Sequence, residues 1–394
     1  MPLRKILVPI RELSESGKLS GLLLLLATVV SLLVSNSVLG PNYLHFWETP
    51  LGWAPLQKTL AHWVDDGLMV VFFFSVGLEI KREVLYGELT DVRQALLPIL
   101  AAVGGVAVPA GIYLAFNAGT ATGHGWAVPT ATDIAFSLGI LSLLGEKVPP
   151  GLRVFLTALA IIDDLIAVLI IALFYTQGLD LTYLLAAGGI MAVLVLLNRL
   201  RVTWLPLYFL LGLALWFFVL KSGIHATIAG VLLALTIPTD AIEKLEAALH
   251  KPISYLILPV FALANTAIVV SAGAVSELLS PLGLGVALGL LLGKPLGIFG
   301  ATWLTVKAGI SALPERVTWF KMLGLGLTAG IGFTMAIFIA NLSFHDPGRV
   351  DVAKLAVILG SLLAALAGLF VLHLADKADD SEAPVGPTES EIEV

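Results

Sequence analysis

Long apolar stretches separated by short polar segments run along nearly the whole chain. A helix that crosses the hydrocarbon core of a bilayer needs roughly 20 predominantly apolar residues. The pattern therefore predicts an all-α polytopic membrane protein with twelve transmembrane helices. The predicted spans are residues 20–38, 59–80, 95–117, 124–143, 150–175, 182–198, 204–220, 223–238, 252–272, 281–306, 318–343 and 351–374.

The positions of the basic residues support this number of spans. Cytoplasmic ends and loops of membrane proteins carry an excess of Lys and Arg. If the N-terminus is cytoplasmic, most of the 22 Lys and Arg fall on the cytoplasmic side, and Lys294 lies within a span. Twelve spans then place both termini in the cytoplasm. The basic residues left on the outer side are Lys58, Lys221, Arg349 and Lys354.

Composition agrees with a membrane protein. Of the 394 residues, 58% are hydrophobic and 13% are charged, whereas a soluble domain has about 25% charged residues. We expect residues 1–375 to form one membrane domain and residues 376–394, which are acidic and contain two prolines, to form a disordered tail. The chain has no cysteine, no phosphate-binding glycine loop, no zinc-type histidine cluster and no nucleophilic serine motif, so no cofactor, enzymatic role or nucleic-acid partner is indicated.

Two of the predicted spans are poor helices. Pro129 interrupts 124–143, and four glycines and two threonines lie between Gly324 and Thr334 of 318–343. Spans three to five and ten to twelve then form matching triplets, each with an interrupted middle member. This pattern predicts an inverted-topology repeat in which the two interrupted helices cross at a transport site. The alternative is that the small residues serve only helix packing.

Four charged side chains are predicted at membrane depth. Asp163 and Asp164 are adjacent within 150–175, Lys294 lies in the tenth span, and Asp133 lies in the first interruption. A charge at this depth costs at least ~2.5 kcal/mol, and two adjacent carboxylates repel one another. Adjacent helix positions point about 100° apart, so one aspartate can pair with Lys294 while the other faces a water-filled cavity. One structural ion pair would leave the second aspartate and Asp133 unexplained, so the set indicates ion or proton transport.

The interruptions explain two of these charges. Helix N-termini carry partial positive charge and helix C-termini partial negative charge. Asp133 is therefore predicted to balance the helix N-termini at the crossing, and Lys294 the C-termini.

Two further features lie near the predicted membrane surfaces. Loop 40–58 is rich in aromatic residues, Pro and Gly, which predicts either a structured hairpin on the outer surface or an interfacial aromatic belt. A charged group at the cytoplasmic mouth is either a solvated helix end with local salt bridges or a funnel whose charge changes with pH. This group includes Glu79, Arg82, Glu83, Glu246 and His250.

Six motifs give the chain a resemblance to the NhaA-type sodium/proton antiporters of bacteria, over residues from about 10 to 375. The motifs are Pro129-Thr-Ala-Thr132-Asp133, Ala160-Ile-Ile-Asp163-Asp164-Leu, Gly77-Leu-Glu79-Ile-Lys-Arg82-Glu83, Ser222-Gly-Ile-His225-Ala-Thr, Gly293-Lys294-Pro-Leu-Gly and Gly330-Ile-Gly-Phe-Thr-Met.

The resemblance implies an electrogenic, pH-activated antiporter of the inner membrane that exchanges cytoplasmic Na+ or Li+ for external protons. Asp164 would be the main Na+ ligand, Asp163 would share this role and exchange its bond with Lys294, and Thr132 would add oxygens. Asp133 and Lys294 would compensate the charges of the helix ends.

The resemblance also implies roles outside the ion-binding site. The hairpin within 40–58 would join a homodimer, and Asp65 would line an outer funnel. Where the family usually has a second histidine near Glu246, this chain has Ala247, so the pH threshold does not carry over. The residues implied in pH regulation are Glu79, Arg82, Glu83, Glu246, His250 and His225.

Three other functions fit the sequence less well. A sodium-coupled symporter of an organic anion with the same architecture would need a roomy cavity with polar groups for its substrate, but the interrupted spans supply acids and small residues. A passive cation channel would be obstructed by Lys294. An intramembrane aspartyl protease would need a Gly-x-Gly-Asp sequence, which this chain lacks.

Overall fold

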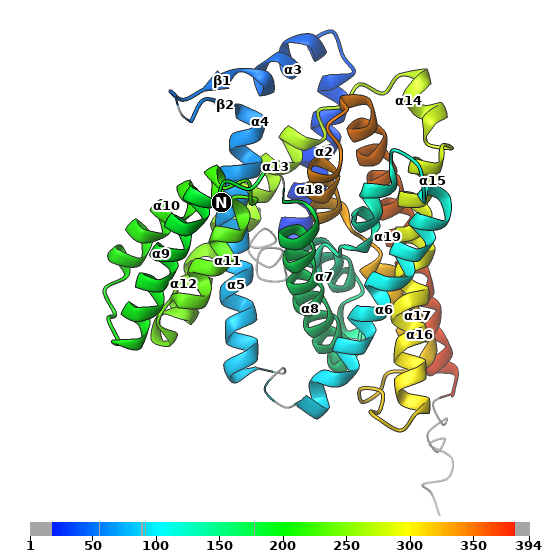
Figure 1. The fold of residues 1–394 in the computed structure, drawn as a ribbon. Coiled ribbons are helices and arrows are strands. Elements are labelled where there is room, and N and C mark those ends of the chain that lie inside the picture. Colours follow the sequence, from blue (N-terminus) through cyan, green and yellow to red (C-terminus); the bar gives the residue numbers. More distant parts are fainter. Residues whose placement is uncertain (1–17, 55, 88–89, 91, 177, 383–394) are drawn as a thin grey trace, which may run out of the picture.

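The computed structural model describes residues 18–54, 56–87, 90, 92–176 and 178–382. This part of the chain is mostly helical (Figure 1). The first elements are α2 (Lys18–Ser35), α3 (Gly40–Glu48), β1 (Pro50–Leu51), β2 (Lys58–Thr59), α4 (Leu60–Trp63), η1 (Val64–Leu68), α5 (Met69–Tyr86), α6 (Val92–Asn117), η2 (Gly123–Thr130), α7 (Ile134–Leu143), η3 (Gly145–Lys147), α8 (Pro150–Phe174) and α9 (Leu181–Arg199). The later elements are α10 (Leu205–Lys221), α11 (Thr227–Thr236), η4 (Thr239–Ala241), α12 (Ile242–Pro252), η5 (Ile253–Ile257), α13 (Leu258–Asn265), α14 (Ala272–Glu277), α15 (Pro281–Leu288), η6 (Gly289–Gly293), α16 (Lys294–Lys307), α17 (Trp319–Ala329), α18 (Phe333–Ser343) and α19 (Pro347–Glu382).

The helices confirm a polytopic membrane protein. Among the described residues, seven helical segments are long and apolar enough to cross a membrane, or up to nine if two bent helix pairs each count as one span. The apolar helices α10 and α11 are shorter, with 17 and 10 residues. The second predicted span, 59–80, corresponds to α4, η1 and most of α5, and it contains the acidic residues Asp65, Asp66 and Glu79. The number twelve therefore stays a prediction.

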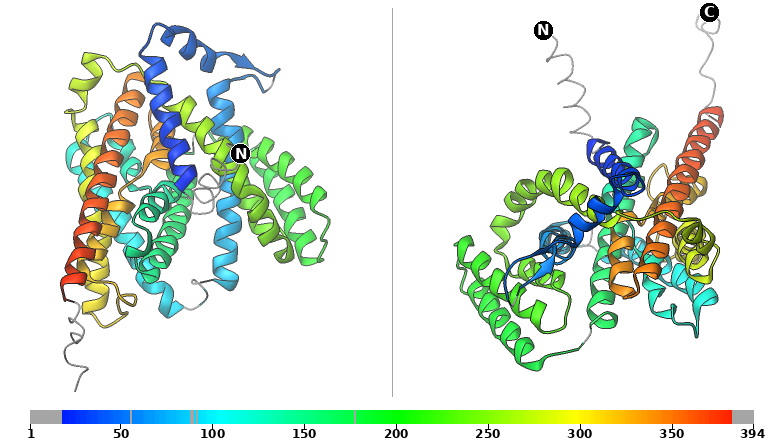
Figure 2. Two further views of the ribbon diagram at one scale, coloured as in Figure 1. Left: turned by 180° about the vertical axis from the view of Figure 1, so that it is seen from behind. Right: turned by 90° about the horizontal axis from the view of Figure 1, so that it is seen from above.

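A hairpin forms within the predicted outer loop 40–58. Strands β1 and β2 pair antiparallel, with Pro50 opposite Thr59 and Leu51 opposite Lys58. Helix α3 precedes the hairpin, and the two lie over one end of the helix bundle (Figures 1 and 2). We call this end the hairpin end. The structured hairpin predicted from the sequence is thus confirmed.

Both predicted interruptions are present. In the first, the 3-10 helix η2 ends at Thr130, residues 131–133 are non-helical, and α7 begins at Ile134. In the second, α17 and α18 are separated by residues 330–332 and bent by 46°. Proline cannot donate a backbone hydrogen bond, and glycine has a low helix propensity, so both sequences disfavour a continuous helix.

Three turns of π-helix, η1, η5 and η6, were not predicted. Each lies inside a longer helical segment, and η6 ends immediately before Lys294. Single π-helical turns often occur at functional sites, since the extra residue changes the direction of the side chains that follow. A hydrophobicity pattern does not reveal them.

The last helix is longer than predicted. Helix α19 continues to Glu382, whereas the predicted span ended at residue 374. Residues 376–382, which were predicted to begin the disordered tail, are helical instead, since they continue α19 beyond its apolar part. The rest of the predicted tail, 383–394, lies outside the described residues.

Helices α6 and α16 pack closely at two glycines. A Cβ atom at Gly104 would collide with the carbonyl oxygen of Gly297, and a Cβ atom at Gly297 would collide with that of Gly104. Small residues allow such backbone contact between membrane helices. Because Gly297 lies one turn after Lys294, this contact also fixes the position of the lysine.

We expect a Gly297→Leu substitution to destabilise the protein, because the new side chain has no space against α6. Overpacking a well-packed site typically costs about 1–3 kcal/mol. The measurement is thermal unfolding of the purified protein in detergent. Gly300→Leu is the matched control, since a Cβ atom at Gly300 would meet nothing within 4 Å. Equal melting of the two variants would contradict the expected close contact.

Candidate ion-binding site

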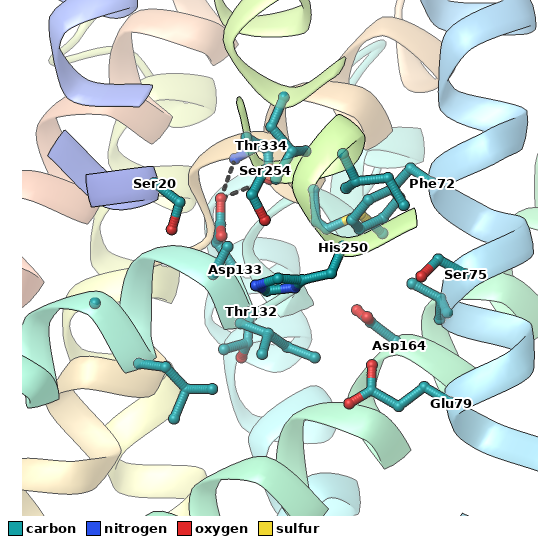
Figure 3. A pocket seen from close by; sticks show the side chains of 18 residues that line it. Ser20, Phe72, Ser75, Glu79, Thr132, Asp133, Asp164, His250, Ser254 and Thr334 are labelled. Atoms are coloured by element: carbon teal, nitrogen blue, oxygen red, sulfur yellow. Dashed lines mark hydrogen bonds between the residues drawn. The ribbon is translucent and has the colours of Figure 1, made fainter. Parts of the chain in front are cut away.

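A cavity of about 340 Å³ lies where α5, α7, α8, α12 and α18 meet (Figure 3). Phe72, Val76 and Leu258 contribute to its apolar wall. Its polar side chains come from segments far apart in the sequence. They are Ser20, Ser75, Glu79, Thr132, Asp133, Asp164, His250, Ser254 and Thr334.

The two adjacent aspartates of α8 face different surroundings. Asp164 lines the cavity, whereas Asp163 points to Lys294, whose Nζ donates to Asp163 Oδ2 at 2.7 Å. The side chains of Lys294 and Asp163 are 0% and 1% exposed, so this ion pair is fully buried. The other oxygen of Asp163, Oδ1, is buried and accepts no hydrogen bond from the described residues.

Asp133 lies at the N-termini of two half-helices. Its Oδ1 accepts a hydrogen bond from the amide of Phe136 in the first turn of α7, at 3.0 Å. Its Oδ2 accepts from the amide of Thr334 in α18 at 3.0 Å and from the hydroxyl of Thr334 at 2.5 Å. Unpaired amides and the helix dipole both favour an anion at such a position.

Further hydrogen bonds join the two interruptions. The hydroxyl of Thr132 donates to the carbonyl of Ala329 at 2.9 Å, and that of Ser137 to the carbonyl of Thr328 at 2.9 Å. The hydroxyl of Ser361 in α19 accepts from the amides of residues 332 and 333. These side chains therefore satisfy several polar backbone groups at the two breaks, and the amide of Asp133 donates to the carbonyl of Ile331 at 2.7 Å.

Asp133→Ala is expected to lower the free energy of unfolding by about 2 kcal/mol, since loss of a helix-capping side chain costs about 0.5–2 kcal/mol and Asp133 serves two helices. Thermal melting of the purified variant measures this effect. Asp180→Ala is the control, because Asp180 caps α9 alone, accepting from the amides of Thr182 and Tyr183. If Asp133→Ala lowered the melting temperature no more than Asp180→Ala, Asp133 would not cap two helices.

The predicted cytoplasmic group is connected by ion pairs. Arg82 contacts Glu83 at 3.0 Å and Glu246 at 3.1 Å, which ties α5 to α12. Glu79 and His250, each on one of these helices, line the cavity. The group therefore reaches the cavity through Glu79 and His250. Arg82 and Glu83 lie near the end of α5 that is away from the hairpin end (Figure 1).

Two predicted residues lie away from the cavity. His225 precedes α11, and its Nε2 lies 3.0 Å from the carbonyl oxygen of Tyr175. Asp65 in η1 accepts hydrogen bonds from Asn265 and Asn341. Neither His225 nor Asp65 lines the cavity that contains Asp164.

Some polar residues near the site were not predicted. The hydroxyls of Ser20, Ser75 and Ser254 line the cavity. Asn265 and Asn341 lie in predicted spans and contact one another. A polar side chain inside an apolar span was the available signal, but serine also occurs at ordinary helix contacts in membranes.

The cavity provides hard oxygen ligands. Carboxylate, hydroxyl and carbonyl oxygens suit hard cations such as Na+, and Asp164 and Thr132 present such atoms. In the part of the chain that the structure describes, no group of three or more His, Asp or Glu is placed to hold a metal ion.

Comparison with known proteins gives consistent results. A family model described as Na+/H+ antiporter 1 matches residues 11–372. A protein of Flavobacterium johnsoniae named Na(+)/H(+) antiporter NhaA 2 is 52% identical over 374 residues, covering 92% of each chain. Proteins named Na(+)/H(+) antiporter NhaA from Bordetella parapertussis and Cytophaga hutchinsonii are 48% and 49% identical, covering 93% and 91% of this chain and 96% and 94% of their own.

Proposed function

We propose, since the chain belongs to the Na+/H+ antiporter 1 family, that it moves Na+ or Li+ out of the bacterial cytoplasm in exchange for protons. The observation that carries this proposal is the division of the aspartate pair. Asp164 faces a cavity, while Asp163 is held by Lys294. Asp164 is thus placed to bind the transported ion. Asp163 is placed to exchange its contact with Lys294 for a contact with that ion.

Competition for Asp164 gives the exchange its mechanism. A carboxylate must be deprotonated to bind a cation, so binding of Na+ releases a proton. A proton arriving from the other side then displaces Na+. Thr132 lines the same cavity and is placed to add a hydroxyl oxygen to the coordination of Na+.

The buried ion pair supports electrogenic exchange. If Asp163 leaves Lys294 to contact the bound cation, a second proton can be released from this pair, and more protons than Na+ ions move in each cycle. The membrane potential, worth ~2.3 kcal/mol per charge per 100 mV, then drives Na+ outward. Either Asp163 or Lys294 can be the second proton carrier.

We propose that the protein carries out this exchange with an inverted-repeat architecture of twelve spans. Elements α6–α8 and α15–α19 would be the two repeats, with the segments η2–α7 and α17–α18 crossing at their interruptions. The hydrogen bonds between Asp133 and Thr334 and between Thr132 and Ala329 support this assignment. Both termini would be cytoplasmic, and the hairpin with α3 would join two protomers.

The charged group of α5 and α12 is proposed to confer pH regulation. Glu79, Arg82, Glu83, Glu246 and His250 lie at the end of the cavity away from the hairpin end, which would be the cytoplasmic mouth. Protonation there would change the ion pairs of Arg82 with Glu83 and Glu246 and so the contact between the two helices. His225 would influence the pH profile from its separate position beside Tyr175.

Exchange can be tested in proteoliposomes that hold a pH gradient. Na+, Li+ and K+ are added in turn over a pH series, and the collapse of the gradient is followed with a fluorescent dye. We expect collapse with Na+ and Li+ that increases toward alkaline pH. Absence of collapse with every cation at every pH would contradict antiport and favour the alternative, a sodium-coupled symporter of an organic anion.

A further inference from the structure

A second polar cluster lies toward the hairpin end. Asp65 accepts from the side-chain amides of Asn265 at 2.8 Å and Asn341 at 3.0 Å. Asn265 Oδ1 in turn accepts from Asn341 at 2.6 Å and from the ammonium of Lys354 at 3.3 Å. These four residues, which we call the outer cluster, come from η1, α13, α18 and α19.

Aromatic rings separate the outer cluster from the cavity. Phe338 lies 5.4 Å from Phe73 and 6.4 Å from Phe261 between ring centroids, and the three rings are at most 1% exposed. Each ring belongs to a helical segment that also carries a residue lining the cavity and a residue of the outer cluster, and the ring lies between these two along the segment. In α18 the order from the cavity outward is Met335, Phe338 and Asn341, and in α13 it is Leu258, Phe261 and Asn265. In α5 and η1 the order is Val76, Phe73 and Asp65.

This layered order points to a role in transport. We infer that Asp65, Asn265, Asn341 and Lys354 form a latch that holds the hairpin side of the ion path closed while the cavity is open toward Glu79 and His250. The inference rests on the proposed antiport, in which Asp164 must face the two sides in turn.

The contacts of the latch suit this role. They join η1 and α13 on one side to α18 and α19 on the other, so these elements cannot separate until the hydrogen bonds of the cluster break. Lys354 is also close enough to Asp65 and Asp351 to interact with both electrostatically. Polar contacts can re-form with water when the path opens, unlike the packing of a fixed apolar core.

The latch can be tested with a reporter cysteine, because the chain has no cysteine of its own. Ser75→Cys places a thiol on the cavity wall. A membrane-impermeant cationic methanethiosulfonate reagent is added to reconstituted vesicles from the hairpin side or from the opposite side. With the latch intact, we expect fast labelling from the opposite side and slow labelling from the hairpin side.

Lys354→Met should weaken the latch, because it removes the ammonium group while keeping a long unbranched side chain. Removing a charge-assisted hydrogen bond shifts the balance between closed and open states, so labelling from the hairpin side should become about tenfold faster. Lys354→Arg should keep the slow rate. Arg349→Gln is the matched control, since Arg349 is exposed in the same helix and lies outside the outer cluster.

Separate measurements distinguish the possible failures. Unchanged labelling from the opposite side would show that the variant protein is folded around the cavity. If Lys354→Met does not fold, Asn341→Ala replaces it, since that substitution keeps every charge. Labelling from the hairpin side that is equally slow in all variants, or fast with the latch intact, would overturn the latch. Absence of Na+/H+ exchange by the Ser75→Cys protein and by the unmodified chain would instead contradict the proposed function.

Discussion

Asp164→Asn is expected to abolish Na+-dependent proton exchange, with a loss of rate of about 100-fold or more. The amide has nearly the shape of the carboxylate, but it has no negative charge and cannot release a proton when Na+ binds. Because Asp164 lines the cavity while Asp163 is engaged with Lys294, Asp163 should not replace it. The assay is cation-induced collapse of a pH gradient in proteoliposomes.

Asp240→Asn is the control for this variant, since Asp240 is exposed in η4 and the substitution makes the same chemical change. We expect its exchange rate to match that of the unmodified protein. If Asp164→Asn retained substantial exchange of Na+ for protons, Asp164 would not be the carboxylate for which the ions compete.

Breaking the buried ion pair should have the largest effect on stability. Lys294→Gln leaves Asp163 without its partner, and Asp163→Asn does the same to Lys294. Removing one member of a buried pair typically costs about 3–5 kcal/mol, whereas removing both costs much less. The double variant Asp163→Asn/Lys294→Gln should therefore unfold at a higher temperature than either single variant. Simple addition of the two single losses would contradict a coupled pair.

Lys294→Gln also identifies the second proton carrier. If Lys294 carries that proton, the variant should be electroneutral or inactive when its charge movement is recorded on a solid-supported membrane. Electrogenic exchange by Lys294→Gln would instead assign the second proton to Asp163.

Much of the site could be predicted because charges are rare and costly in apolar spans. Asp133, Asp163, Asp164 and Lys294 are recognisable for this reason. Helix geometry alone does not say which aspartate pairs with Lys294, since that depends on how α8 is rotated against α16. The resemblance implied Asp163, and Asp163 is the aspartate that Lys294 contacts. The outer cluster was missed because Asn265, Asn341 and Lys354 each look like an isolated polar residue until folding brings them together.

The two helix interruptions of the fold could also be predicted from the sequence. Pro129 and the glycines between residues 324 and 332 indicate the two interruptions, because they disfavour a helix locally. The π-helical turns and the continuation of α19 to Glu382 follow from packing or from weak local preferences, which an average over 20 residues does not resolve. The short helix α11, with 10 residues, shows why the number of spans is harder to predict than the polytopic class.

Competition between Na+ and protons at Asp164 is the central claim, and proton release on binding tests it most directly. Na+ is added to purified, weakly buffered protein in detergent, and the pH change is recorded over a range of starting pH values, with choline as the control cation. The account predicts saturable proton release with Na+ and Li+ that is lost in Asp164→Asn. Saturable Na+ binding without proton release, or equal release by Asp164→Asn, would contradict it.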